Sequence, residues 1–417
     1  MKQKTLLTTF FSRFFILFLN FGLVIYTTNF WGSEGKGSIS IVIADLTVIS
    51  FFANIFVGSS MSYFASRYKI EEILPFAYLW SVITGISIPL LFSFSHAVPY
   101  SGYLISLSVL TSLLTANVNL FVGQKNITMF NIYTILQQLI HIIFIIIIVY
   151  LINISSIEAY FMAQAGCLGL LFLTSIFQIV KPGMLKRISF SGATGKKLFS
   201  YGWKTQLSAF LQFLNNRLSF YFLEYFRGMV SVGVFSVGIA VSEAVWTISR
   251  SLSVILYADV INTASPHQAI EKTKISLRIS FLITLLFIAV MLIIPARVYS
   301  FIFGKDFSQT KEIVLLLAPG ILAIAVSNII GYYFAGINKL RILNVKALIG
   351  LIFTLVSSFL IIPKWGIRGA CIITSLSYCL SSGLLFWRFY RITEFRFRDY
   401  FLSKAEMGIL MKKLQKK

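Results

Sequence analysis

The sequence predicts an all-α integral membrane protein with twelve transmembrane helices in two six-helix bundles. Three observations lead to this fold class: an apolar composition, a series of long apolar runs and an internal repeat. Of 417 residues, 57% are hydrophobic and 12% are charged, whereas soluble proteins carry about 25% charged residues. A soluble globule of this size could not bury so much apolar side chain. We expect both termini in the cytoplasm and a central cavity between the bundles.

Twelve apolar runs have about the 20 residues that a helix needs to cross a bilayer. In order, they are 8–29, 37–58, 73–95, 101–121, 127–150, 157–180, 205–226, 229–257, 277–296, 313–335, 343–362 and 366–387. They divide the chain into an N-terminal bundle (1–180), a basic cytoplasmic linker (181–204), a C-terminal bundle (205–387) and a basic amphipathic cytoplasmic tail (388–417). The first run lacks a small-residue cleavage site, so we expect a span there rather than a signal peptide.

The basic residues support this topology. The chain has 36 Lys and Arg against 14 Asp and Glu, a formal charge of +22. With the N-terminus inside, three basic residues lie within spans and 26 on the inner side, as the positive-inside rule requires. The seven on the outer side are Lys36, Arg227, Arg297, Lys305, Lys311, Lys364 and Arg368. The charge is thus explained by the membrane, and the sequence has none of the spacings typical of nucleic-acid binding.

Cofactor and catalytic signatures are absent from the sequence. Cys167, Cys371 and Cys379 lie in apolar stretches without CxxC spacing, which indicates small buried residues rather than a disulfide framework or a metal site. The sequence contains no HExxH, no GxSxG and no loop-borne acidic pair. We therefore expect no cofactor and no enzymatic activity.

An internal repeat relates the two halves at an offset of 196 residues. The paired identities include Asn20 with Asn216, Gly32 with Gly228 and Gly37 with Gly233. Because six spans is an even number, the halves enter the bilayer in the same orientation and form parallel repeats. This architecture is typical of transporters, whose substrate cavity lies between the repeats.

Ionisable residues inside spans are expected to face a wet cavity or a partner, because each costs about 2.5–3.5 kcal/mol in the bilayer. Arg217, near mid-depth, is expected to contact an anion in the cavity, the alternative being a structural ion pair. Arg13 lies one turn into the first span, where it could snorkel to the surface. Glu243 and Arg250 are seven residues apart and share a helix face; a cavity role and structural bracing are equally compatible with that spacing.

Two further polar residues lie in the spans of the first half. Asp45 is a candidate for exchanging a proton or a sodium ion, as is Glu243, since a buried carboxylate can titrate near neutral pH. The favoured alternative is that Asp45 neutralises Arg13 or Arg217. His141 is expected to be a hydrogen-bonded packing residue rather than a proton relay.

Several short segments resemble those of a known family. The first outer turn, Trp31-Gly32-Ser33-Glu34-Gly35-Lys36-Gly37, resembles the Gly-x-Glu-x-x-Gly turn of polysaccharide flippases of the multidrug/oligosaccharidyl-lipid/polysaccharide exporter superfamily. Segments 228–237, 317–320, 333–336 and 366–370 are also similar to that family. Twelve spans favour an O-antigen flippase (Wzx-type) over the fourteen-span lipid II flippases.

The resemblance implies a substrate, a membrane and partners. The substrate would be an undecaprenyl-diphosphate-linked oligosaccharide, moved by alternating access from the cytoplasmic to the periplasmic leaflet of the bacterial cytoplasmic membrane. Arg217, helped by Arg13 or Arg250, would hold the diphosphate through charge-assisted hydrogen bonds, and Asn20 and Asn216 would donate to the sugar. A glycan polymerase and a chain-length regulator are candidate partners, and a proton or sodium gradient is a candidate energy source.

Three other functions compete with this one. A flippase for another prenyl-linked glycan, such as a capsule or teichoic-acid precursor, has the same sequence features. A drug/cation antiporter of the same superfamily needs acidic groups where this chain has Arg13 and Arg217. A membrane-embedded glycan polymerase or ligase needs a large outer loop, whereas the longest outer interval, near 297–312, is short.

Overall fold

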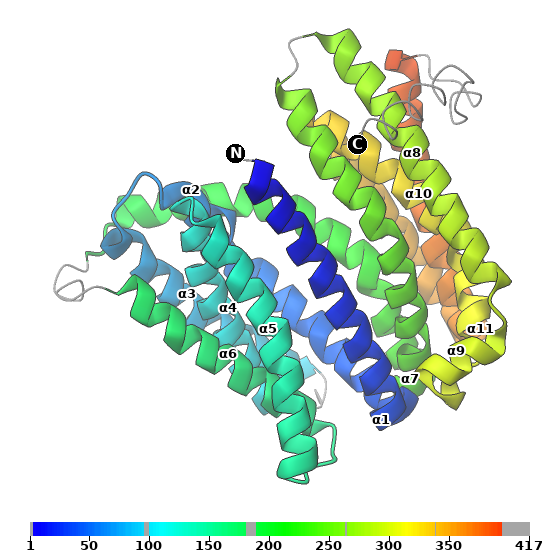
Figure 1. Ribbon diagram of the computed structural model, residues 1–417, viewed down its shortest axis with the longest axis horizontal. Helices are drawn as coiled ribbons and strands as arrows, with labels where there is room; N and C mark the ends of the chain where they lie inside the picture. Colours follow the sequence, from blue (N-terminus) through cyan, green and yellow to red (C-terminus); the bar gives the residue numbers. More distant parts are fainter. Residues whose placement is uncertain (1–2, 96–99, 181–188, 263–264, 338, 394–417) are drawn as a thin grey trace. The chain divides into compact units, whose positions relative to one another are not determined.

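All regular structure in the described residues is helical (Figure 1). The computed structural model describes the chain except residues 1–2, 96–99, 181–188, 263–264, 338 and 394–417. The α-helices are α1 (Gln3–Val57), α2 (Ser59–Phe64), α3 (Ile70–Ser95), α4 (Ser101–Gly123), α5 (Ile127–Ile146), α6 (Glu158–Ile179), α7 (Gly192–Asn262), α8 (Pro266–Ile293), α9 (Ala296–Phe303), α10 (Thr310–Gly336) and α11 (Leu340–Thr393). A π-helical turn (Ile147–Leu151) extends α5, and a 3₁₀ turn (Lys305–Phe307) follows α9.

Three of the helices are each interrupted at one glycine, where the chain reverses. The breaks lie at Gly32 in α1, Gly228 in α7 and Gly366 in α11, and Figure 1 shows the two arms of α1 meeting in a sharp turn. Within the described residues, nine helices are long and apolar enough to span a membrane, and these three have candidate stretches of 51 to 53 residues. Such a stretch is more than twice the roughly 20 residues of one crossing.

Glycine is required at these reversals by the backbone conformation. Gly32 has φ 65° and ψ −164°, and Gly228 has φ 78° and ψ 176°. This region of backbone space is essentially closed to residues with a Cβ atom. The two glycines are paired by the 196-residue repeat, so the repeat reproduces the same reversal near the start of each half.

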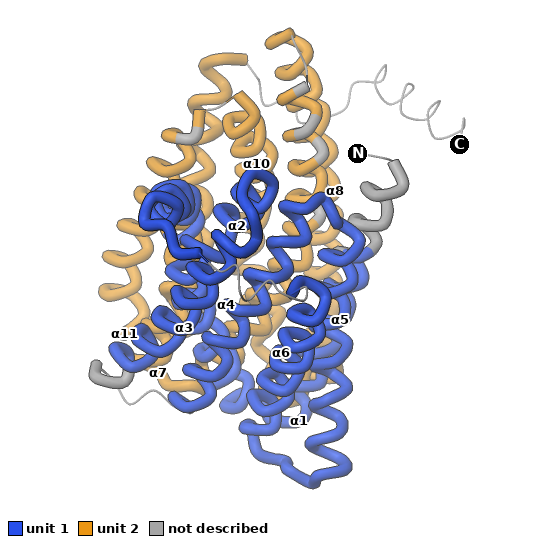
Figure 2. The backbone as a smooth tube through the Cα atoms, turned by 90° about the vertical axis from the view of Figure 1, so that its left-hand side faces the viewer, with its two compact units in different colours: residues 1–210 blue, residues 211–417 orange. Residues whose placement is uncertain are grey.

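The chain divides into two compact units, residues 1–210 and 211–417 (Figure 2). The boundary lies within α7. In the predicted linker 181–204, residues 192–204 form the first turns of α7, and residues 181–188 lie outside the described part. α11 continues to Thr393, and the rest of the predicted tail also lies outside the described residues. The domain limits expected from the sequence therefore stay a prediction.

Unit 1 packs α1, α3, α4, α5 and α6 around an apolar core that contains the fully buried Phe161 and Met61. Trp31, next to the Gly32 turn, donates from Nε1 to the carbonyl oxygen of Ser155 at 2.9 Å. This bond joins the α1 reversal to the segment that leads into α6. The turn is therefore tied to the bundle by a hydrogen bond as well as by the packing of the Trp31 ring against the core.

Unit 2 is held at its corresponding end by an arginine. Arg227, adjacent to the Gly228 turn, donates from Nη2 to the carbonyl oxygens of Pro363 at 2.6 Å and Lys364 at 3.1 Å. These carbonyls belong to the turn around Gly366, so one side chain joins the reversals of α7 and α11. Arg368 forms a 2.6 Å ion pair with Glu312 at the start of α10.

Large apolar side chains cover the outside of the helices. Phe177 on α6 is 83% exposed and Phe301 on α9 is 86% exposed. Many other Leu, Ile, Val and Phe side chains on the candidate spans are also exposed. Exposed apolar surface of this extent is typical of proteins that contact lipid rather than water, so the structure fits an integral membrane protein.

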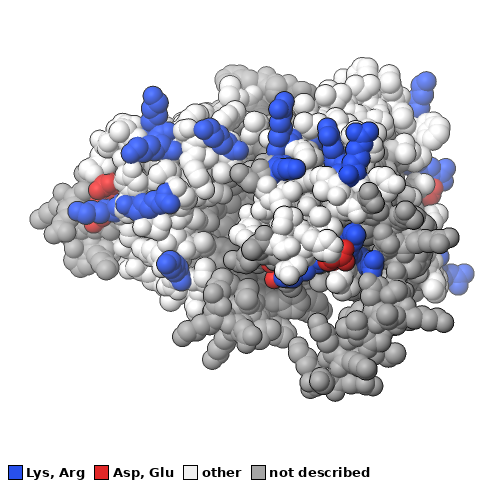
Figure 3. Space-filling view, turned by 90° about the horizontal axis from the view of Figure 1, so that it is seen from above, with Lys and Arg blue, Asp and Glu red and all other residues white. Residues whose placement is uncertain are grey.

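One end of unit 1 gathers basic side chains. At the end where α1 begins, the loops and helix starts carry Arg67, Lys69, Lys125, Lys196, Lys197 and Lys204. Figure 3 looks onto this end and shows many more Lys and Arg than Asp and Glu among the described residues. These are residues expected on the inner side; the side of the membrane on which the termini lie stays a prediction.

The reversal at Gly228 can be tested with a matched pair of substitutions. A Cβ added at Gly228 or at Gly383, within α11, meets no neighbouring atom, and only Gly228 has a positive φ. We expect Gly228→Ala to destabilise the protein by about 1–3 kcal/mol because of backbone strain. Gly383→Ala should be neutral or stabilising, because Ala favours a helix by about 1 kcal/mol. Thermal unfolding of the purified protein in detergent measures both, and equal melting temperatures would contradict the strain argument.

Candidate functional site

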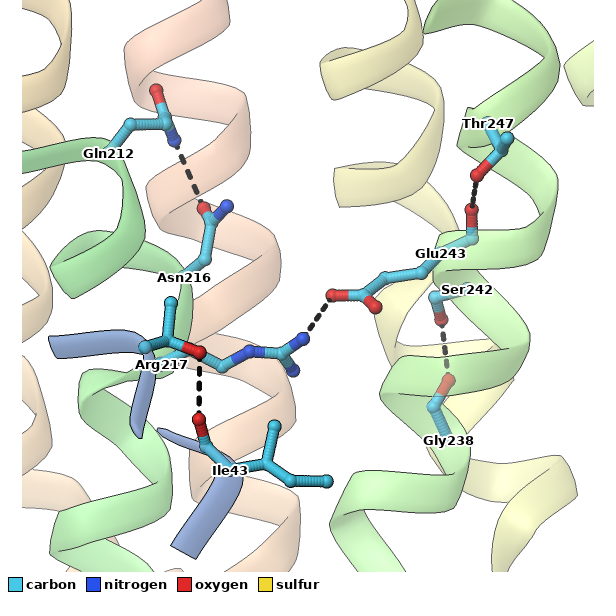
Figure 4. Close-up of polar contacts among 9 residues, drawn as sticks. Ile43, Gln212, Asn216, Arg217, Gly238, Ser242, Glu243 and Thr247 are labelled. Carbon is cyan, nitrogen blue, oxygen red and sulfur yellow. Dashed lines mark hydrogen bonds and ion pairs between the residues drawn. The ribbon is translucent and has the colours of Figure 1, made fainter. Parts of the chain in front are cut away.

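Arg217 and Glu243 form an ion pair inside unit 2. Arg217 lies on the first arm of α7 and Glu243 on the second, and Nη2 donates to Oε1 at 2.7 Å (Figure 4). The helix rise of 1.5 Å per residue places them about 16 and 22 Å from Gly228. A hydrocarbon core is about 30 Å thick, so these distances from the turn are of the order of half a crossing. The Gly228 reversal therefore brings the two charges together.

The pair is partly exposed. The side chain of Arg217 is 26% exposed and that of Glu243 is 34% exposed. The guanidinium also lies 5.0 Å from the centre of the Phe220 ring, a cation–π contact. A guanidinium carries five N–H donors, more than one carboxylate oxygen can accept. The sequence left an anion contact and a structural ion pair open for Arg217, and this arrangement leaves room for both.

The polar residues beside Arg217 point in different directions. Asn216 accepts a hydrogen bond at 3.0 Å from Gln212, one turn earlier on α7, and is partly exposed (Figure 4). Asn215 is 2% exposed, and its Oδ1 accepts from Thr354 Oγ1 at 2.7 Å and Ser377 Oγ at 2.9 Å. Successive residues on a helix point about 100° apart, so a run of three polar residues must place one of them toward the core. Asn215 is a structural residue that the sequence analysis left unassigned.

Unit 1 contains a polar pocket within its spans. It has a volume of about 210 Å³ and includes Asn20, which the sequence placed at the substrate. Its other polar lining side chains are Gln137, Gln138, His141, Tyr160, Gln164 and Cys167. The Oε1 atom of Gln164 is buried, with no hydrogen-bond partner among the described residues. A polar cavity at membrane depth is by default a candidate for function.

The pocket's histidine and cysteine are held by neighbouring backbone. His141 Nε2 lies 3.4 Å from the carbonyl oxygen of Tyr160, and Cys167 Sγ donates to the Gln137 carbonyl oxygen at 3.3 Å. His141 is thus buried and hydrogen-bonded, in the manner expected of a packing residue, yet it also lines the pocket. The glutamines were missed because they are uncharged and no motif contains them; the signal that could have found them is their position as amide side chains inside two apolar runs.

The remaining candidates occupy different environments. Asp45, on the second arm of α1, is buried at 6% exposure and is engaged by a neighbour. Arg250 lies two turns beyond Glu243, with which it was predicted to share a helix face. Its side chain is exposed, whereas that of Glu243 is partly buried. Arg13 lies in α1, and its side chain falls outside the described part of the structure. The roles given to these three residues stay predictions.

Comparison with known sequences gives limited information. No family model matches the chain. The capsular polysaccharide biosynthesis protein CapF of Staphylococcus aureus is 24% identical over 185 residues, which are 44% of this chain. The match spans 47% of the length of that protein, about half of it.

Comparison with solved structures defines the fold. The lipid II flippase MurJ in an inward closed conformation has a TM-score of 0.72 and 15% identity, covering 95% of this chain and 88% of that one. An inward-facing multidrug resistance MATE family transporter of the MOP superfamily has a TM-score of 0.71 and 14% identity, covering 90% and 94%. A MOP superfamily transporter from Pyrococcus furiosus has a TM-score of 0.65 and 13% identity, covering 94% and 96%.

These structures share the all-helical fold of this chain, and together with its long apolar helices they indicate a multi-pass membrane protein. The solved neighbours are transporters and flippases rather than enzymes. At identities of 13–15%, they establish the fold of the chain and leave its substrate open.

The structural role of Asn215 can be separated from that of Asn216. We expect Asn215→Ala to destabilise the protein by about 1 kcal/mol, because it removes the acceptor for two hydroxyl groups between helices. Asn216→Ala removes one partly exposed bond within a single helix and should change stability by less than about 0.5 kcal/mol. Chemical denaturation in detergent compares the two variants. Equal losses of stability would show that the Asn215 network is not stabilising.

Proposed function

We propose that this protein is a flippase that moves a prenyl-diphosphate-linked oligosaccharide from the cytoplasmic to the periplasmic leaflet of a bacterial cytoplasmic membrane. The observation that supports this most strongly is the partly exposed Arg217–Glu243 pair inside unit 2. A diphosphate carries at least two negative charges and cannot cross hydrocarbon unaided. A guanidinium at membrane depth can replace part of its hydration with charge-assisted hydrogen bonds.

The topology proposed for this activity assigns one crossing to each arm of α1, α7 and α11. Together with α3, α4, α5, α6, α8 and α10, these arms give the twelve predicted crossings. Each unit then contributes six, and alternating access follows from rocking of one unit against the other. Basic residues gather at the end of unit 1 where α1 begins, and this favours a cytoplasmic location for that end.

The sugar would be held by uncharged groups. Asn20 and the glutamines of the unit 1 pocket are donors and acceptors suited to hydroxyl groups. The local similarity to a capsular polysaccharide biosynthesis protein supports a glycan substrate, and a capsule precursor is as compatible with it as an O-antigen unit. A glycan polymerase and a chain-length regulator are the proposed partners for either substrate.

Glu243 supplies a release mechanism in this proposal. The carboxylate and the diphosphate compete for the same guanidinium, since both are anions that bind its N–H groups. Binding of a proton or a sodium ion to Glu243 would free Arg217 to hold the substrate, and loss of that cation would restore the ion pair and expel the diphosphate. Asp45 remains a second candidate for ion exchange.

The role of Arg217 is tested by complementation. The chain is expressed in a bacterium that lacks its glycan flippase but contains the matching glycosyltransferases, and surface glycan is measured. We expect wild type to restore it, Arg217→Ala to lose at least about 90% of it and Arg217→Lys to retain part, because Lys keeps the charge without the bidentate fork. Arg341→Ala, an exposed arginine at the start of α11, is the matched control at equal membrane abundance. Wild-type activity in Arg217→Ala would refute the proposed site.

The competition at Glu243 predicts opposite effects on binding and release. In Glu243→Gln the side chain is permanently uncharged, so the substrate meets no competing carboxylate. We expect more lipid-linked glycan to co-purify with this variant than with wild type, and surface glycan to fall about tenfold or more. Glu271→Gln, in an exposed i,i+3 pair with Lys274, is the control and should behave as wild type. Unchanged transport by Glu243→Gln would exclude the competition mechanism.

A further inference from the structure

A second pocket of unit 1 shares no lining residue with the His141 pocket. It has a volume of about 540 Å³ and lies where α1 ends, between α2, α4 and the first turns of α7. This is the end of unit 1 at which the basic residues gather. Three amide side chains, Asn54, Asn119 and Gln206, and three hydroxyl side chains, Ser59, Ser62 and Thr115, line it.

The walls of this pocket are fixed by polar bonds at the end of α1. The last carbonyl groups of a helix have no partner within the helix and need one from outside. Here Ser60 Oγ donates to the Ile55 and Phe56 carbonyl oxygens at 2.6 and 2.8 Å, and Asn119 Nδ2 donates to the Val57 carbonyl oxygen at 2.8 Å. α4 is thereby joined to the end of α1.

A close backbone contact sets the fourth side of the pocket. A Cβ atom at Gly202 would overlap the carbonyl oxygen of Ile55, so only glycine lets α7 pack this near to α1. This approach brings Tyr201 and Gln206 of α7 to the pocket. The amide and hydroxyl groups thus belong to helices whose packing is already determined, which is the preorganisation a binding site needs.

Two tyrosines of the lining stack on each other. The rings of Tyr63 and Tyr201, both lining residues, stack with centroids 4.5 Å apart and planes 17° apart. The guanidinium of Arg67 lies over the Tyr63 ring, 3.8 Å from its centre, and also contacts the Tyr63 hydroxyl. Two tyrosines held in this way lose little conformational entropy when a ligand binds, and each presents both an apolar ring and a polar tip.

The lining chemistry identifies a class of ligand. The lining residues include no Asp, Glu, Lys, Arg or His. Amides and hydroxyls both donate and accept hydrogen bonds, so they match a ligand with many neutral hydroxyl groups better than an anion or a cation. The volume lies within the range of small-molecule sites, about 300–1,000 Å³, and is large enough for more than one sugar ring.

We propose that this pocket binds uncharged sugar units of an oligosaccharide. That this oligosaccharide belongs to a lipid-linked glycan presented in the cytoplasm rests on the proposed function. The pocket is then a subsite for distal sugars, separate from the cationic residue that would hold the diphosphate. It makes glycan recognition depend on unit 1 and charge recognition depend on unit 2.

Protection of an introduced cysteine tests the proposal directly. Ser59 is exposed and lines the pocket, whereas native Cys167 and Cys371 are buried and Cys379 is partly buried. The full chain with Ser59→Cys is placed in lipid nanodiscs and labelled with a maleimide in the presence of chitotriose, maltotriose or inorganic diphosphate. We expect at least one trisaccharide at millimolar concentration to slow labelling about threefold or more, and diphosphate to have no effect.

Two controls make the result specific. Ser66→Cys, exposed at the same end of unit 1 but outside the lining, should label at a rate that no sugar changes. Adding Gln206→Ala to Ser59→Cys should raise the sugar concentration that gives half-maximal protection about fivefold, the effect of losing one hydrogen bond on affinity. The corresponding change Gln178→Ala, on the exposed face of α6, should leave protection intact.

Each outcome decides between the possibilities. Protection of Ser59→Cys that Gln206→Ala weakens supports a sugar subsite. Protection by diphosphate alone, by neither trisaccharide, or equally at Ser66→Cys overturns it. The complementation assay with Arg217 variants is independent: failure there with sugar protection intact refutes flipping and retains the pocket, whereas restored surface glycan without sugar protection refutes the pocket alone.

Discussion

The absence of water from the bilayer core is the constraint on which the structure depends. A backbone that leaves the helical conformation there must find partners for its amide and carbonyl groups. This chain leaves the helical conformation at Gly32, Gly228 and Gly366, where it reverses. Side chains beside two of these turns bind the backbone of other segments: Trp31 donates to Ser155 in unit 1, and Arg227 donates to Pro363 and Lys364 in unit 2. The Gly228 reversal also places Arg217 opposite Glu243. The candidate charge site is therefore a product of the same turn that keeps α7 within the membrane.

The fold was largely predictable because its signal is composition and length. Apolar runs, the repeat and the glycine pairs indicated the helices and the turns, and the helix limits fall within a few residues of most expected spans. Polar residues interrupt two of the expected spans: Asn215, Asn216 and Arg217 lie in 205–226, and Glu243 and Arg250 lie in 229–257. In the structure Arg217 and Glu243 form an ion pair. The charge that makes each span less apolar is therefore neutralised by the charge of the other span.

The candidate site was only partly predictable. The free-energy cost of placing a charge in the bilayer identified Arg217 from sequence. It could not choose among Asp45, Glu243 and a substrate as the counter-charge, because that choice depends on how a helix reverses. Asn20 was chosen for its pairing with Asn216, and it lies in a pocket completed by α5 and α6 residues. At the 196-residue offset, Arg217 and Glu243 correspond to Phe21 and Thr47. The repeat thus preserved the turn while the two halves acquired different chemistry.

The bonds of Arg227 have a mechanical consequence. One guanidinium joins the turn of α7 to the turn of α11, and the Arg368–Glu312 pair adds the start of α10 to the same end. Three helices are coupled there by charge-assisted bonds, and relative sliding among them would break several at once. This end of unit 2 should consequently move as one rigid body.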